Sequence, residues 1–255
     1  MQRGVTRGKV AQTVAGTEAI EIKATIPGHQ VEAALARYAL TVDNDQERYI
    51  YFFDTPALDL LRAGIIARAR RIVDEEHDST VKLRPVVPAE VPEKWRKYSG
   101  FKIEADASEK GVVKSTSFTM PVAKGFIKQV AAGKISIAKL FTNAQETFLS
   151  EMADRTIDYA SLETLGPLQA HRWKFEDPAC PWEIIAELWR REDGARLMEA
   201  SIKAPVVQAA AALGGFMAFL AEVGAEQDRD QQAKTRWALN YYTKRTDRGR
   251  RTRGR

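Results

Sequence analysis

Apolar and charged residues alternate along several short stretches of the chain, beginning with residues 18–26 (EAIEIKATI). Successive side chains of a strand point to opposite faces, so this period of two predicts β-strands. Aromatic and β-branched residues indicate a further strand at residues 48–53 (RYIYFF). The same criteria predict eight strands, at residues 18–26, 48–53, 65–73, 79–85, 100–106, 167–176, 182–191 and 196–203.

Helical spacing of apolar residues predicts helices at residues 29–40, 205–224 and 229–243. A helical insertion is expected between the fifth and sixth strands, over about residues 121–164. Residues 204–221 carry no charge, but alanine dominates them, and alanine is a weak membrane residue. We therefore expect a helix packed on a core and no membrane partner.

The predicted strands carry charged side chains of particular types on one face. Residues two or four positions apart on a strand share a face, and several such sets are charged. They are Glu21 with Lys23, Arg68 with Arg70, Lys82 with Arg84, Lys102 with Glu104 and Asp106, Arg172 with Lys174, Glu183 with Glu187, and Glu199 with Lys203.

Two interpretations of these faces stay open at this point. A sheet with one face on the core shows polar residues to solvent on the other. Alternatively, the sheet closes and the charges line an interior, where the cations would repel one another unless they held an anion. Arginine and lysine suit phosphate oxygens, and carboxylates hold Mg²⁺ or Mn²⁺. An enclosed face would therefore indicate phosphoryl chemistry on a polyanion such as a triphosphate.

Composition and charge limit the classes of protein to which this chain can belong. The 255 residues are 44% hydrophobic, which is typical of a globular chain, and the single cysteine, Cys180, excludes an internal disulfide. The chain has a net charge of +5, but residues 244–255 carry +6 and residues 1–16 carry +3. The body between them is therefore acidic, at −4. We expect two disordered tails, 1–16 and 244–255, around one domain at residues 17–243, and no nucleic-acid partner.

At these charged strands the sequence resembles the CYTH superfamily, the triphosphate tunnel metalloenzymes, over about residues 18–204. The strongest match is residues 51–70 (YFFDTPALDLLRAGIIARAR), which is similar to the family's YYDT…L…G…LRxR segment. Supporting segments are residues 80–84 (TVKLR), the alternation of Lys102, Glu104 and Asp106, and residues 197–203 (LMEASIK). The resemblance implies an α+β fold: an eight-stranded antiparallel closed β-barrel, the tunnel, with surrounding helices and a helical insertion.

The resemblance also implies a role for each charged side chain. Glu21 and Lys23 would be catalytic, with Lys23 orienting water or a leaving oxygen. The side chains assigned to the phosphate chain are Arg68, Arg70, Lys82, Arg84, Lys102, Arg172, Lys174 and Lys203. The candidate ligands of Mg²⁺ or Mn²⁺ are Glu21, Glu104, Asp106, Glu187 and Glu199.

One departure from the family pattern keeps three functions open. The family's first strand reads Glu-x-Glu-x-Lys, and here Ala19 replaces the first glutamate, ahead of Glu21 and Lys23. The first function is metal-dependent hydrolysis of inorganic tripolyphosphate or of a nucleoside or thiamine triphosphate. The second is a class IV type of adenylyl cyclase, which converts ATP to cyclic AMP. The third, motivated by Ala19, is non-catalytic binding of polyphosphate or nucleotide.

Some expectations concern residues outside the charged faces. Trp173, Trp182 and Trp189 are expected on the outer side of the barrel, and Lys234 and Arg236 on a solvated face of the last helix. We expect a cytoplasmic protein that is a monomer or a homodimer.

Overall fold

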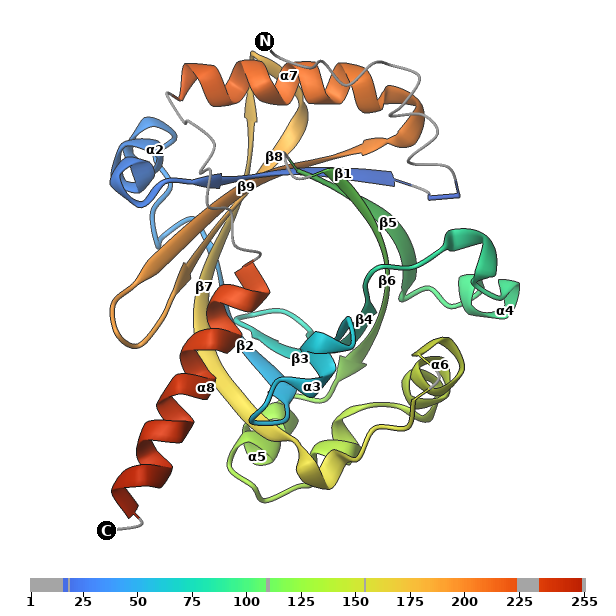
Figure 1. The fold of residues 1–255 in the computed structure, drawn as a ribbon. Helices are drawn as coiled ribbons and strands as arrows, with labels where there is room; N and C mark the ends of the chain where they lie inside the picture. Colours follow the sequence, from blue (N-terminus) through green and yellow to red (C-terminus); the bar gives the residue numbers. More distant parts are fainter. Residues whose placement is uncertain (1–15, 18, 109–110, 154, 224–233, 254–255) are drawn as a thin grey trace.

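Nine strands close into one barrel in the part of the chain that the computed structural model describes, residues 16–17, 19–108, 111–153, 155–223 and 234–253 (Figure 1). The strands are β1 (Ala19–Ile26), β2 (Gln46–Asp54), β3 (Ile65–Ile72), β4 (His77–Leu83), β5 (Phe101–Ser108), β6 (Gly111–Val122), β7 (Glu163–Asp177), β8 (Cys180–Arg190) and β9 (Arg196–Pro205). Their order around the barrel is β1-β5-β6-β4-β3-β2-β7-β8-β9.

The prediction of eight antiparallel strands is corrected on both points. The additional strand is β6, where buried Ser115 and Thr116 stand in place of the apolar residues by which the other strands were recognised. Strand direction alternates around an antiparallel ring, so an odd number of strands cannot close without a parallel pair. That pair is β1 with β5, in which Ala19 lies opposite Glu104. The other neighbouring pairs are antiparallel.

The helices lie outside the barrel wall or at its ends. They are α2 (Val31–Arg37), α3 (Asp59–Arg62), α4 (Glu93–Arg96), α5 (Phe126–Ala131), α6 (Asn143–Ala153), α7 (Ala209–Glu222) and α8 (Lys234–Arg253). The predicted helical insertion is present as α5 and α6. Residues 244–253, expected in a disordered tail, continue α8, whereas the predicted tail at residues 1–16 lies outside the described residues apart from Gly16. No helix within the described residues is long and apolar enough to cross a membrane.

In two clusters, apolar side chains of the strands face outward against the helices. On β1, Ile20 and Ile22 are buried in a cluster with Phe216 of α7, and α7 lies across β1, β8 and β9 (Figure 1). On the other side, Phe118 of β6 packs against Phe148 of α6, with ring centroids 6.0 Å apart. Because side chains alternate along a strand, burial of the apolar face outside turns the charged face inward.

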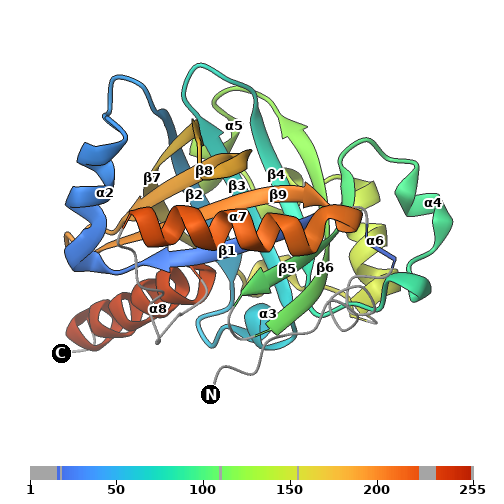
Figure 2. The ribbon, with the colours of Figure 1, turned by 90° about the horizontal axis from the view of Figure 1, so that it is seen from above.

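One end of the barrel interior is apolar. Phe52, Leu168 and Trp189 pack there with Leu239 and Tyr242 of α8, and α8 lies at the same end of the barrel as α3 (Figure 2). Trp189 thus faces inward, which corrects the prediction that it covers the outer side. The reason is register, since Trp189 lies two residues from Glu187, whose side chain meets Arg48 across the barrel interior, and Trp189 packs against α8. Trp173 lies in the outer cluster, as predicted.

Candidate functional site

Ion pairs between strands that are not neighbours in the sheet show that the charged face lies inside the barrel. Lys82 of β4 approaches Asp106 of β5 with Nζ 3.2 Å from Oδ2, although β6 lies between these strands. Arg48 of β2 lies 3.5 Å from Glu187 of β8, although β7 separates them. Side chains meet in this way only across the concave side of a closed sheet.

Asp106 is the centre of the first charged cluster. It is 3% exposed, and its Oδ1 lies 3.0 Å from Lys23 Nζ. On its other oxygen it meets Lys82 and, at 3.8 Å, Arg84 Nη1, and accepts a hydrogen bond of 3.2 Å from Ser115 Oγ. Burial raises the pKa of Asp106, but the three cations outweigh burial and hold it well below its usual range. Asp106 is therefore an anion surrounded by positive charge.

Two further pairs extend this cluster along β1 and β9. Lys23 Nζ lies 2.9 Å from Glu21, and Lys203 Nζ lies 2.6 Å from Glu104. Burial lowers the pKa of Lys23, but Glu21 and Asp106 outweigh it, so the pKa is raised well above its usual value. Lys23 stays protonated at neutral pH, so it can orient and donate but cannot accept a proton.

A second cluster, on other strands of the barrel, consists of four arginines: Arg48, Arg68, Arg70 and Arg172. Burial lowers the pKa of Arg48 to about 10, with contributions from Arg70 and Arg172. Burial and then Arg70 lower the pKa of Arg68 to about 10. Within the described part of the chain, Arg68 Nε has no hydrogen-bond partner. The cluster therefore holds buried and partly buried positive charge that an anion would stabilise.

The arginine cluster has two neighbouring carboxylates. Arg70 forms a bidentate ion pair with Asp78, with Nη2 2.6 Å from Oδ2 and Nε 3.0 Å from Oδ1. Glu187 faces Arg48 and also forms an ion pair with Lys234 at the start of α8. Lys234 Nζ lies 2.8 Å from Glu199 as well. The two acidic residues of β8 and β9 are thus joined through a lysine from the last helix.

The structure brings most of the predicted site residues into these two clusters. Lys174 is not among them, because it pairs with Glu183 at 3.0 Å and both side chains are about half-exposed. Lys102 is exposed on β5, two residues beyond Glu104 on the same face. Both cations lie toward strand ends, where the alternation of faces no longer implies enclosure.

Three residues of the clusters were missed or misjudged from the sequence. Arg48 lies on a strand that the sequence marks by its aromatic residues, and Asp78 lies between the predicted strands 65–73 and 79–85. Lys234 was expected on a solvated helix face, but it is 15% exposed inside the barrel end. Arg48 lies two residues from Ile50 and four from Phe52, and this spacing could have placed its side chain on the same face of the strand as theirs. Nothing local indicated Lys234, since its place depends on where α8 docks.

The carboxylates do not form a ready metal site as placed. Among the described residues, no group of three or more histidine, cysteine, aspartate or glutamate side chains could hold a metal ion. The candidate ligands are instead paired with cations, and Ala19 lies opposite Glu104, where a further carboxylate was expected. The predicted Mg²⁺ or Mn²⁺ stays a prediction, and the residues present do not fit it in this arrangement.

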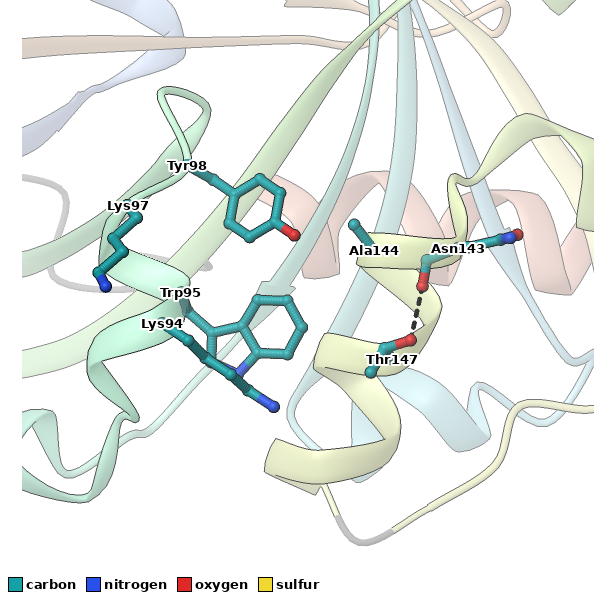
Figure 3. A pocket seen from close by; sticks show the side chains of 7 residues that line it. All are labelled: Lys94, Trp95, Lys97, Tyr98, Asn143, Ala144 and Thr147. Carbon is teal, nitrogen blue, oxygen red and sulfur yellow. Dashed lines mark hydrogen bonds between the residues drawn. The ribbon is translucent and has the colours of Figure 1, made fainter.

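A pocket of about 620 Å³ also lies outside the barrel, between α4 and α6 (Figure 3). Its lining residues are Lys94, Trp95, Lys97, Tyr98, Asn143, Ala144 and Thr147. Trp95 and Tyr98 stack at 5.8 Å, and Lys94 pairs with Glu151 at 2.6 Å. None of the charged strand residues lines this pocket, so it is separate from the two clusters.

Comparison with known proteins supports the fold. No protein-family model matches the chain, and no curated protein sequence matches it. A solved structure of a candidate adenylate cyclase from Bacillus halodurans has a TM-score of 0.59 at 12% identity, over 86% of this chain and 97% of the other. A candidate adenylyl cyclase from Hippeastrum, which has a dominant triphosphatase activity, has a TM-score of 0.60 at 16% identity, over 86% and 93%. At this identity the likeness establishes the fold alone, and the closed barrel with surrounding helices is the part of the fold implied by the CYTH resemblance that the structure confirms.

Proposed function

We propose that this chain, with the fold of the CYTH-type proteins, binds a triphosphate or polyphosphate inside its barrel and hydrolyses a phosphoanhydride bond there. The observation that carries the proposal is the arginine cluster, in which Arg68 is partly buried and its buried Nε has no hydrogen-bond partner among the described residues. Guanidinium groups match phosphate oxygens in charge and geometry. The activity of the Hippeastrum protein adds support for a triphosphate as the class of substrate.

The charge balance of the two clusters also favours a polyanion. Nine cations face six carboxylates, which leaves three positive charges in excess among these side chains. The cations are Lys23, Arg48, Arg68, Arg70, Lys82, Arg84, Arg172, Lys203 and Lys234. The carboxylates are Glu21, Asp78, Glu104, Asp106, Glu187 and Glu199. A triphosphate chain carries enough negative charge to neutralise this excess.

In the hydrolytic step, the oxygen of a water molecule attacks the terminal phosphorus. The bond from that phosphorus to the bridging oxygen breaks, orthophosphate and the shortened chain leave, and a proton passes to solvent. Arg68 and Arg70 would stabilise negative charge on the phosphate oxygens. Lys23, which stays protonated between Glu21 and Asp106, would orient the water or the leaving oxygen.

A second candidate function is binding without turnover. Ala19 replaces the first glutamate of the family pattern, and the candidate metal ligands are paired with lysine or arginine. A barrel of this kind would hold a polyphosphate or nucleotide through its cations alone.

One experiment separates these possibilities. The protein is incubated with tripolyphosphate and with ATP, each with EDTA, Mg²⁺ or Mn²⁺, and its melting temperature is measured with each ligand. Phosphate release that is lost in Arg68→Met supports hydrolysis, and a raised melting temperature without turnover supports the binder. Cyclic AMP would identify a cyclase, and dependence on Mg²⁺ would support the predicted cofactor. No thermal shift at millimolar ligand would contradict a polyanion site altogether.

A further inference from the structure

The ammonium group of Lys234 lies between two carboxylates that were candidate metal ligands. Its Nζ is 2.8 Å from Glu199 Oε1 and forms a short ion pair with Glu187 Oε2. All three side chains are only 14–16% exposed. Glu187 and Glu199 are direct register partners on β8 and β9, where two like charges repel unless a cation lies between them.

The surroundings of this ammonium suit an organic cation better than a divalent metal. Lys234 Nζ lies 5.0 Å from the ring centroid of Trp189, within the range of a cation–π interaction. The indole Nε1 of Trp189 donates to Glu187 Oε2 at 3.3 Å. Mg²⁺ and Mn²⁺ prefer oxygen ligands, and an indole face supplies none.

The docking of α8 holds Lys234 in place. Ala238 and Leu239 are buried in the apolar end of the barrel, and Tyr242 donates from its hydroxyl to the carbonyl of Pro167 at 2.8 Å. Lys234 is the first residue of α8 in the described part of the chain, and both carboxylates that its ammonium group contacts belong to strands. The carboxylates of β8 and β9, not the helix, therefore account for a buried lysine here.

We propose that Lys234 is the resident cation of the Glu187–Glu199 pair. It occupies the position that a divalent ion would take between these carboxylates, so the folded protein has no divalent metal site there. Loss of the Lys234 ammonium would open such a site. This inference goes beyond the proposed function and requires no turnover.

The test measures Mn²⁺ binding directly, without phosphate, by electron paramagnetic resonance and calorimetry on the full chain. Lys234→Met is expected to bind one more Mn²⁺ ion than the wild type. Its affinity for this ion should be at least about tenfold higher than that of any Mn²⁺ binding in the wild type that depends on Glu187. Adding Glu199→Gln to Lys234→Met should abolish the gain. Lys234→Arg, which keeps the charge, should behave as the wild type.

A matched control is Lys174→Met, which frees Glu183 in an exposed ion pair and should gain no Mn²⁺ site. A folded Lys234→Met variant, judged by near-ultraviolet circular dichroism, that gains no Mn²⁺ would overturn the proposal. If Lys234→Met does not fold, Glu187→Gln in the wild-type background decides: unchanged Mn²⁺ binding supports the proposal, and weakened binding overturns it. Because no phosphate is present, these outcomes are independent of whether the barrel hydrolyses triphosphate.

Discussion

Replacing Asp106 with asparagine removes one negative charge from among three cations. Asp106 is 3% exposed, and Lys23, Lys82 and Arg84 lie 3.0, 3.2 and 3.8 Å from its oxygens. Asparagine has nearly the same shape, so packing is retained while the cations lose their common partner. Removing one partner of a buried ion pair costs about 3–5 kcal/mol, because an uncompensated charge stays buried.

The melting temperature provides the assay for this loss. For a domain of this size, 1 kcal/mol shifts the melting temperature by about 2–4 °C, so Asp106→Asn should lower it by roughly 6–20 °C. The matched control is Glu183→Gln, which makes the same chemical change in an exposed pair with Lys174. An exposed pair contributes about 0–1 kcal/mol, so the control should shift the melting temperature by only a few degrees.

Tripolyphosphate adds a second readout to the same variant. Its negative charge replaces what Asp106 supplied, so saturating ligand should raise the melting temperature of Asp106→Asn more than that of the wild type. The reasoning would be refuted if Asp106→Asn lost no more stability than Glu183→Gln. A smaller ligand-induced shift in Asp106→Asn than in the wild type would refute the link between Asp106 and the anion site.

Three further predictions test the site. Arg68→Met should weaken tripolyphosphate binding, measured by calorimetry, roughly 10- to 100-fold, since a hydrogen bond to a charged group contributes about 1.5–3 kcal/mol. Arg190 is exposed on β8, so Arg190→Met should change the affinity for tripolyphosphate little. Equal losses of affinity in the two variants would contradict the proposed site. Ala19→Glu should tighten Mn²⁺ binding and raise phosphate release, and tighter binding with flat turnover would show that the missing ligand does not limit catalysis. Lys234 and Arg48 overcome burial and depress the pKa of Glu187, so its stabilisation is complete above about pH 4.3 and declines below it. Urea titrations between about pH 3 and 6 should therefore show a weaker acid dependence in Glu187→Gln, and an unchanged slope would contradict this assignment.

Much of the barrel wall was predictable from local pattern. The alternation in EAIEIKATI fixed that Ile20 and Ile22 share one face and Glu21 and Lys23 the other, and the structure buries the first pair against helices. This works because the side-chain period of a strand is a local property of the backbone. It failed for β6, where buried Ser115 and Thr116 give no apolar alternation.

The partners within the site were not predictable in the same way. Sequence spacing placed Lys82 and Asp106 on charged faces, but their contact depends on β6 lying between β4 and β5 and on closure of the barrel. Arg48 was overlooked because its strand is marked by apolar residues, and only its distance to Glu187 reveals its role.

The sequence by itself determined which side chains share a strand face and therefore that cations and carboxylates would be collected on one surface. Only the tertiary structure decided that this surface is enclosed, that nine strands close it with one parallel pair, and that Lys234 enters from α8 to separate Glu187 from Glu199. The physical reason is the sequence separation over which each feature is determined. The face of a strand follows from dihedral angles repeated every two residues, whereas ion pairs across a barrel follow from strand order and helix docking over long sequence separations.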